Sequence, residues 1–114
     1  MKKIGIVIAY KKAEKNLKVS RSRLKEAKKA SRYYADDEIK ALEVELEEDE
    51  AEFAARQEQL KKAIAKIPEK MVRRVAEDHY IKDYTLENLA STYGYSVSSI
   101  KKLLQSARER IDLK

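Results

Sequence analysis

The sequence predicts an all-α protein, in which long N-terminal helices precede a three-helix C-terminal module that contains a helix-turn-helix. The 114 residues include only two glycines and one proline, and 40% of them are charged, a composition typical of long helices or coiled coils. Apolar and small residues recur at alternating spacings of three and four before residue 68, as on one face of a helix. After residue 68, cap residues and a glycine stand where a tight turn between helices needs them.

The net charge of the chain is +6, and the charged residues divide it into three segments. Residues 1–34 hold twelve Lys or Arg against two Glu, for a net +10. Residues 35–60 hold two Lys or Arg against eleven Asp or Glu, for a net −9, and residues 61–114 hold twelve against seven, for a net +5. We therefore expect a helical region over residues 1–67, basic over 1–34 and acidic over 35–60, and a helix-turn-helix domain over residues 68–114.

Two apolar seams predict the helices of the N-terminal region. The first seam consists of Tyr10, Ala13, Leu17, Ser20, Leu24, Ala27, Ser31 and Tyr34. The second consists of Ile39, Leu42, Leu46, Phe53, Leu60, Ala63 and Ile67. The seams do not share a register, and the acidic residues 36–38 between them suit a helix start. Either the basic helix folds back on the acidic helix as a hairpin, or one long helix skips register and pairs with a second chain as a coiled coil.

The first ten residues are ambiguous. Ile6, Val7 and Ile8 are β-branched and Gly5 weakens a helix, so local propensity favours a strand. No partner strand is apparent, and the alternative is a helical start that buries its isoleucines against the hairpin.

Several function classes are disfavoured. The chain has no cysteine and one histidine, which excludes disulfides and makes a zinc site implausible; His79 is expected to be packed or at a rim. We find no nucleophile with a partner base, no glycine-rich phosphate loop and no paired carboxylates, and so expect no enzyme, no cofactor and no metal. No stretch is long enough to span a bilayer, so we expect a cytoplasmic protein without a membrane partner.

Cap residues divide the C-terminal module into three helices. Pro68 suits a first helical turn, and the first helix is predicted from about Pro68 to Lys82. Its inward positions are Met71, Val72, Val75, Ala76 and either His79 or Tyr80. Thr85 caps a helix over Leu86–Tyr93, and Ser96 caps a last helix from Val97 to about Ile111.

The spacing of the last two helices predicts a helix-turn-helix. Small Ala90 stands where the helices cross, and Gly94 supplies the positive φ of the turn. Leu89, Val97, Ile100 and Leu104 are expected to form the shared core.

Residues 75–111, VAEDHYIKDYTLENLASTYGYSVSSIKKLLQSARERI, resemble the fourth region of bacterial sigma factors. The matching features are Tyr80–Ile81, the Thr85–Ala90 segment, Gly94–Tyr95–Ser96 and the arginine-rich last helix. No part resembles the sigma region that melts the promoter. The acidic helical segment before the module is similar in layout to small phage and prophage regulators of the ArpU and RinA type. The resemblance implies activation of transcription by binding DNA near a promoter.

The exposed face of the last helix supplies the candidate site residues. The residues predicted to read base edges are Ser98, Ser99, Lys102 and Gln105, because lysine meets guanine acceptors and glutamine meets adenine. The residues predicted to contact DNA phosphates are Arg73, Arg74, Thr85, Ser96, Lys101 and Arg108.

These observations predict a transcriptional regulator of phage or prophage origin that binds double-stranded DNA and forms a homo-oligomer through its N-terminal helices. The alternative is an interaction module that binds RNA polymerase or another protein, with little DNA specificity of its own. A third alternative is nonspecific nucleic-acid binding by residues 1–34, if the acidic segment leaves them free.

Overall fold

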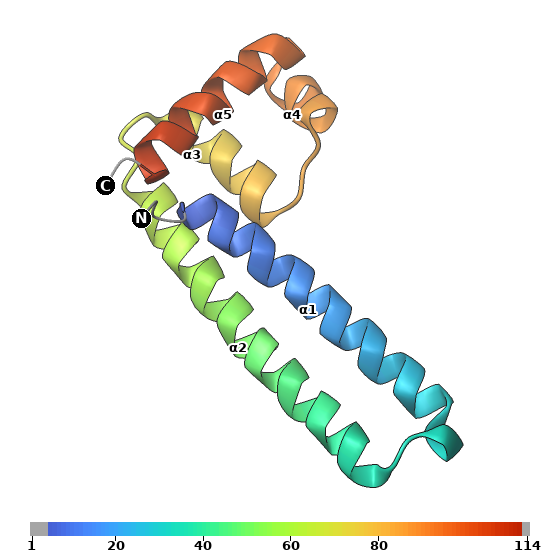
Figure 1. Cartoon of the computed structure of the whole chain (residues 1–114). Coiled ribbons are helices and arrows are strands. Elements are labelled where there is room, and N and C mark those ends of the chain that lie inside the picture. Colours follow the sequence, from blue (N-terminus) through green and yellow to red (C-terminus); the bar gives the residue numbers. More distant parts are fainter. Residues whose placement is uncertain (1–4, 113–114) are drawn as a thin grey trace. The chain divides into compact units, whose positions relative to one another are not determined.

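The computed structural model describes residues 5–112, and all the regular secondary structure in that range is helical (Figure 1). The helices are α1 Ile6–Lys29, α2 Asp36–Ala65, α3 Lys70–Ala76, α4 Leu86–Tyr93 and α5 Val97–Asp112. A 3₁₀ turn, η1, covers Ser31–Tyr33, and a π-helical turn, η2, covers Glu77–Ile81. The all-α prediction is confirmed. Among these residues, none of the helices combines the length and the apolar character needed to cross a membrane.

Contacts divide the chain into two compact units. One unit consists of residues 8–56, and the other combines residues 1–7 with residues 57–114, of which 5–7 and 57–112 are described. Both α1 and α2 run through both units. The predicted division at residue 68 is a different one, and it stays a prediction.

In the unit of residues 8–56, α1 and α2 lie side by side (Figure 1). The Ser20 hydroxyl donates a hydrogen bond to Asp49, and the rings of Tyr10 and Phe53 stack with centroids 5.4 Å apart. The alternative of one continuous N-terminal helix is wrong, because α1 ends at Lys29 and α2 begins at Asp36. Asp36, Asp37 and Glu38 fill the first turn of α2, where negative charge stabilises the helix dipole.

The first seam is confirmed from Tyr10 to Ala27, since each of its six members there is buried. Its predicted end is wrong at Tyr34, which is 40% exposed because the helix has already ended. The side chain of Ser31 lies outside the described residues. In the second seam, Leu60 and Ile67 are buried, whereas the remaining members are half-buried: Ile39, Leu42, Leu46, Phe53 and Ala63.

Of the two alternatives for the first ten residues, the helical start is confirmed from Ile6 onward and the strand is wrong there; residues 1–4 lie outside the described residues. Ile6 is the first residue of α1, and its backbone N–H donates to Asp112 Oδ1 at 2.9 Å. Val7 is buried, while Ile8 is half exposed. Tertiary contacts therefore outweigh the strand propensity of three β-branched residues.

In the second unit, α5 packs against both α3 and α4. Its core includes Val75, Ala76, Leu89, Ile100 and Ala107, all fully buried. Deep apolar burial of this kind is the main source of stability for a module this small.

The predicted first helix of this unit is present as α3 followed by η2, with three differences. Pro68 lies before the helix instead of in its first turn, since Glu69 is the N-cap residue. The helix widens at η2, where the N–H of Lys82 donates to the Glu77 carbonyl at 3.2 Å. Of the inward positions, Met71 and His79 are only half-buried, and Tyr80 is buried.

Candidate nucleic-acid interface

The start of α4 is fixed by a reciprocal cap. The hydroxyl of Thr85 accepts a hydrogen bond from the Asn88 N–H at 3.1 Å, and the Asn88 side-chain oxygen accepts one from the Thr85 N–H at 3.4 Å. Two of the N–H groups that a helix start leaves unpaired are thereby satisfied. The predicted N-cap at Thr85 is confirmed.

The turn between α4 and α5 depends on Gly94 and Ser96. Gly94 has φ 70°, and its N–H donates to the carbonyl of Ala90. This left-handed conformation is the reason for glycine at the end of α4. Ser96 Oγ then accepts from the N–H of Ser99 at 3.1 Å, which caps α5. The predicted positive φ and the predicted cap are both confirmed.

One face of α5 is buried in the second unit. Ile100 and Ala107 are fully buried, and Leu104 is 7% exposed. Val97, which was expected in this core, is only half-buried because it lies in the first turn of the helix. Burial of these positions fixes which side of α5 faces solvent.

The exposed face of α5 carries most of the predicted base-reading residues. Ser98, Lys102 and Gln105 are exposed, and their spacings of four and three place them on one side of the helix. Ser99 differs from them: it is half-buried, and both its N–H and its hydroxyl are hydrogen-bonded to Ser96. Ser99 is therefore occupied in the cap of α5.

An acidic residue follows on the same side of α5. Glu109 is exposed and lies four residues after Gln105, so it continues the row of Ser98, Lys102 and Gln105. The members of this row in the first three turns of α5 carry no negative charge, whereas Glu109, near the end of the helix, does. Only the N-terminal part of α5 therefore suits a polyanion.

The predicted phosphate-binding residues fall into two groups. Lys101 and Arg74 are exposed, and no ion pair is described for either. Arg108 Nε lies 3.6 Å from Asp112 Oδ2, and Arg73 Nη1 donates to the Ile67 carbonyl at 2.8 Å. Arg73 thus bonds to the segment between α2 and α3. The hydroxyls of Thr85 and Ser96 are engaged in caps, so Lys101 and Arg74 are the members best placed to meet a phosphate.

A hydrogen bond that the spacing did not predict joins η2 to α4. Tyr93 Oη donates to Asp78 Oδ2 at 2.5 Å. This bond and burial raise the pKa of Tyr93 to about 12, although the nearby Arg74 opposes the shift. Sequence signals for the pair are weak, because Asp78 and Tyr93 are fifteen residues apart and neither belongs to a recognisable motif.

Two further side chains brace the end of η2. His79 Nδ1 lies 2.9 Å from the Tyr84 carbonyl, which agrees with the expected rim position of this histidine. Burial raises the pKa of Tyr80, while the positive charge of Arg108 opposes that shift.

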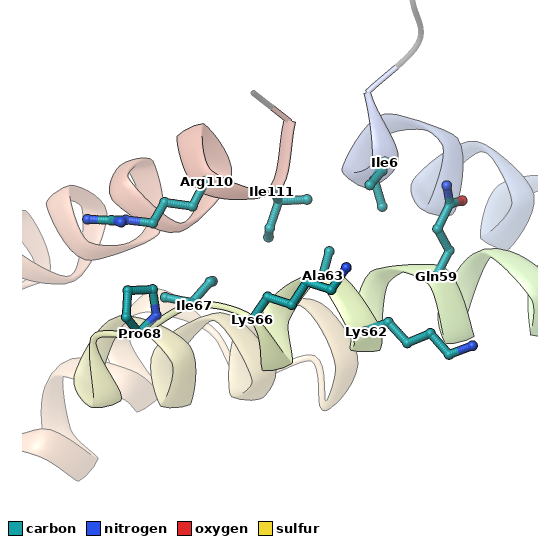
Figure 2. Close-up of a pocket in the computed structure, with 9 residues that line it drawn as sticks. All are labelled: Ile6, Gln59, Lys62, Ala63, Lys66, Ile67, Pro68, Arg110 and Ile111. Atoms are coloured by element: carbon teal, nitrogen blue, oxygen red, sulfur yellow. The ribbon is translucent and has the colours of Figure 1, made fainter. Parts of the chain in front are cut away.

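A pocket of about 500 Å³ lies beside the last turn of α5 (Figure 2). Ile6, Ala63, Ile67 and Ile111 face a common space, whereas the side chains of Lys62 and Arg110 extend away from it. Arg110 forms an ion pair with Glu69. The pocket is thus an apolar recess, separate from the exposed row on α5.

Comparisons with protein-family models, with curated proteins and with solved structures find no significant match.

Proposed function

We propose that the protein binds double-stranded DNA through a helix-turn-helix formed by α4 and α5, and that it regulates transcription. The observation that carries the proposal is the exposed row Ser98, Lys102 and Gln105, which stands opposite the buried face of a capped helix. A recognition helix enters the major groove with its N-terminal residues against the bases. The position of Glu109 agrees with that orientation, since it keeps negative charge at the far end.

Each exposed residue has a distinct role in this proposal. Lys102 donates to the O6 and N7 acceptors of guanine, and Gln105 pairs with adenine. Ser98 is short enough to let the helix approach the base edges closely. Lys101 and Arg74 contact phosphates, which position the module without reading sequence.

The remainder of the chain has a supporting role. We propose that residues 1–67 form a helical hairpin that joins two copies, so that two helix-turn-helix domains read two half-sites. This layout and the resemblance of residues 75–111 to the fourth sigma region support a regulator of the phage or prophage type that acts in the cytoplasm.

The deciding experiment is selection of duplexes from a random library by the intact protein. We expect enrichment of a two-part motif. Lys102→Ala and Gln105→Ala should then each cost about 1–3 kcal/mol on the selected site and relax preference at one base pair. Lys101→Ala should weaken binding to all duplexes alike, and Lys70→Ala, which removes an exposed lysine outside α5, should change neither property.

Two outcomes contradict the proposal. Binding without enrichment, lost steeply as salt rises, would indicate phosphate contacts alone. A protein that binds no duplex but associates with RNA polymerase would instead be an interaction module.

A further inference from the structure

The outward side of α1 carries a stripe of five lysines within residues 8–56. They are all exposed and recur at spacings of four, three, seven and four: Lys11, Lys15, Lys18, Lys25 and Lys29. At about 100° per residue, these positions fall within about 80° of one another on the helix surface. The buried seam from Tyr10 to Ala27 occupies the opposite side. This lysine stripe extends about 27 Å along the helix.

Few carboxylates neutralise the lysine stripe. Within residues 8–56, the one ion pair described between α1 and α2 joins Arg23 to Glu45 at 3.6 Å, and both side chains are largely exposed. Lys11 lies 3.9 Å from Glu14 on its own helix. No ion pair is described for the other four lysines of the stripe. Four of the five outward lysines are therefore without a described ion pair, and the fifth is paired only within α1.

The charges of this unit are separated by helix. Residues 8–56 hold twelve Lys or Arg and twelve Asp or Glu, but α1 alone holds nine Lys or Arg and two Glu. Salt screens charges over about 8–10 Å at physiological ionic strength. Packed helices are already about 8–10 Å apart between their axes, and the lysines project further outward. A polyanion in contact with the lysine stripe is therefore attracted by the lysines much more strongly than it is repelled by the carboxylates of α2.

We propose that the lysine stripe is a second DNA-binding surface, which holds the phosphate backbone of duplex DNA without reading its sequence. Duplex DNA carries one negative charge per about 1.7 Å of its axis, so a straight row of cations matches its edge. Lysine is suited to this contact, because its ammonium group is a flexible point charge with three donors. The inference shares with the proposed function only the partner, duplex DNA.

The composition of the stripe favours duplex DNA over two other polyanions. Single-stranded nucleic acid is held by aromatic side chains that stack on bases, and none of the five positions is aromatic. An anionic membrane binds helices that insert an apolar face, whereas the apolar face of α1 is buried in contact with α2. A surface of exposed lysines alone fits a phosphate backbone.

The test compares two full-length variants with the same change in net charge. One variant replaces the five stripe lysines with Gln, and the matched control replaces five exposed lysines elsewhere: Lys40, Lys61, Lys62, Lys66 and Lys70. Gln has nearly the helix propensity of Lys, and circular dichroism checks the fold. The measurement is the affinity for short duplexes of mixed sequence between about 50 and 200 mM salt.

We expect the slope of log affinity against log salt to decrease in magnitude by about 4 in the stripe variant, since each phosphate contact contributes about 0.9. The slope of the control variant should stay within about 1 of the wild-type slope. If the fivefold variant does not fold, the single variants Lys18→Gln and Lys25→Gln should each decrease the slope by about 1. An unchanged slope, or an equal decrease in the control, would overturn the inference.

Two further measurements separate this inference from its rivals. If the stripe variant loses binding to phosphatidylserine vesicles but keeps its DNA slope, the surface binds membranes and the inference is wrong. The preference for a selected site over a mixed duplex reports on α5 alone. Loss of preference in Lys102→Ala, together with an unchanged slope in the stripe variant, would leave the proposed function standing and remove this inference.

Discussion

The carboxylate of Asp112, in the last turn of α5, accepts a hydrogen bond from the backbone N–H of Ile6, the first residue of α1. The two residues are 106 positions apart. A helix start leaves four N–H groups unpaired and favours negative charge, and here a side chain from the opposite end of the chain meets both needs. Gly5 permits the approach, because a Cβ there would lie 2.9 Å from the carboxyl group of Asp112.

Removal of this cap should destabilise the protein. Asp112→Ala is expected to lower the free energy of unfolding by about 1 kcal/mol, as for the loss of an N-cap, and Asp112→Asn should lower it less because an acceptor remains. Gly5→Ala should be destabilising in the wild type and closer to neutral in Asp112→Ala. Urea denaturation of the wild type, Asp112→Ala, Gly5→Ala and the double variant measures this coupling. Strictly additive effects of the two substitutions would contradict a contact between Gly5 and Asp112.

Gly94 should resist replacement for a conformational reason alone. No atom lies within 4 Å of a Cβ built there, yet φ is +70°. Gly94→Ala is therefore expected to cost about 1–2 kcal/mol by backbone strain, and Gly94→Asn should cost less, since asparagine tolerates the left-handed region. Thermal melts of both variants test the order. Equal stability of Ala and Gly at this position would mean that the turn has another geometry.

Tyr93 should make stability depend on alkaline pH. Its pKa is raised from 10.0 to about 12 by the hydrogen bond to Asp78. The resulting stabilisation is complete below pH 10, where Tyr93 is protonated in both states, and is lost as the pH rises towards 12.

The matched variant is Tyr93→Phe, which should be less stable than the wild type by about 1 kcal/mol at neutral pH. The difference between the two proteins should shrink between pH 10 and 12 in denaturant titrations. The variant also controls for Tyr80, whose pKa is raised in both proteins. A difference that stays constant across this range would show that the bond to Asp78 does not form.

Local signals in the sequence predicted the parts of the fold that local chemistry determines. The bounds of α4, the cap at Thr85 and the turn at Gly94 all follow from residues within a few positions of one another. The apolar seam likewise predicts that Ser20 is buried, but it does not predict the hydrogen-bond partner of Ser20, Asp49. An apolar seam shows which face of a helix is buried. The residues that it meets on the partner helix depend on the length and geometry of the connection between the two helices.

Contacts that the apolar pattern does not contain explain the predictions that are incomplete. Ile6 starts a helix because Asp112 caps it, and no local pattern contains that information. The charge of Arg73 predicts a phosphate contact, which stays a prediction; the structure adds a hydrogen bond from its guanidinium to the Ile67 carbonyl, six residues earlier. In the candidate interface, spacing correctly identifies Ser98, Lys102 and Gln105 as exposed, whereas Ser99 is half-buried and bonded to the predicted cap residue Ser96.

Glu109 provides a test of the proposed docking of α5 on DNA. It is exposed on the same side of the helix as Lys102 and Gln105, one turn further on, and its charge should repel nearby phosphates. Glu109→Gln is expected to strengthen binding to all duplexes a few-fold without changing sequence preference, since one repulsion is removed and no base contact is altered. Glu77→Gln removes an exposed charge outside α5 and should have a smaller effect. If Glu109→Gln instead changes the selected motif, the C-terminal part of α5 also reaches the bases, and the proposed docking of its N-terminal turns is wrong.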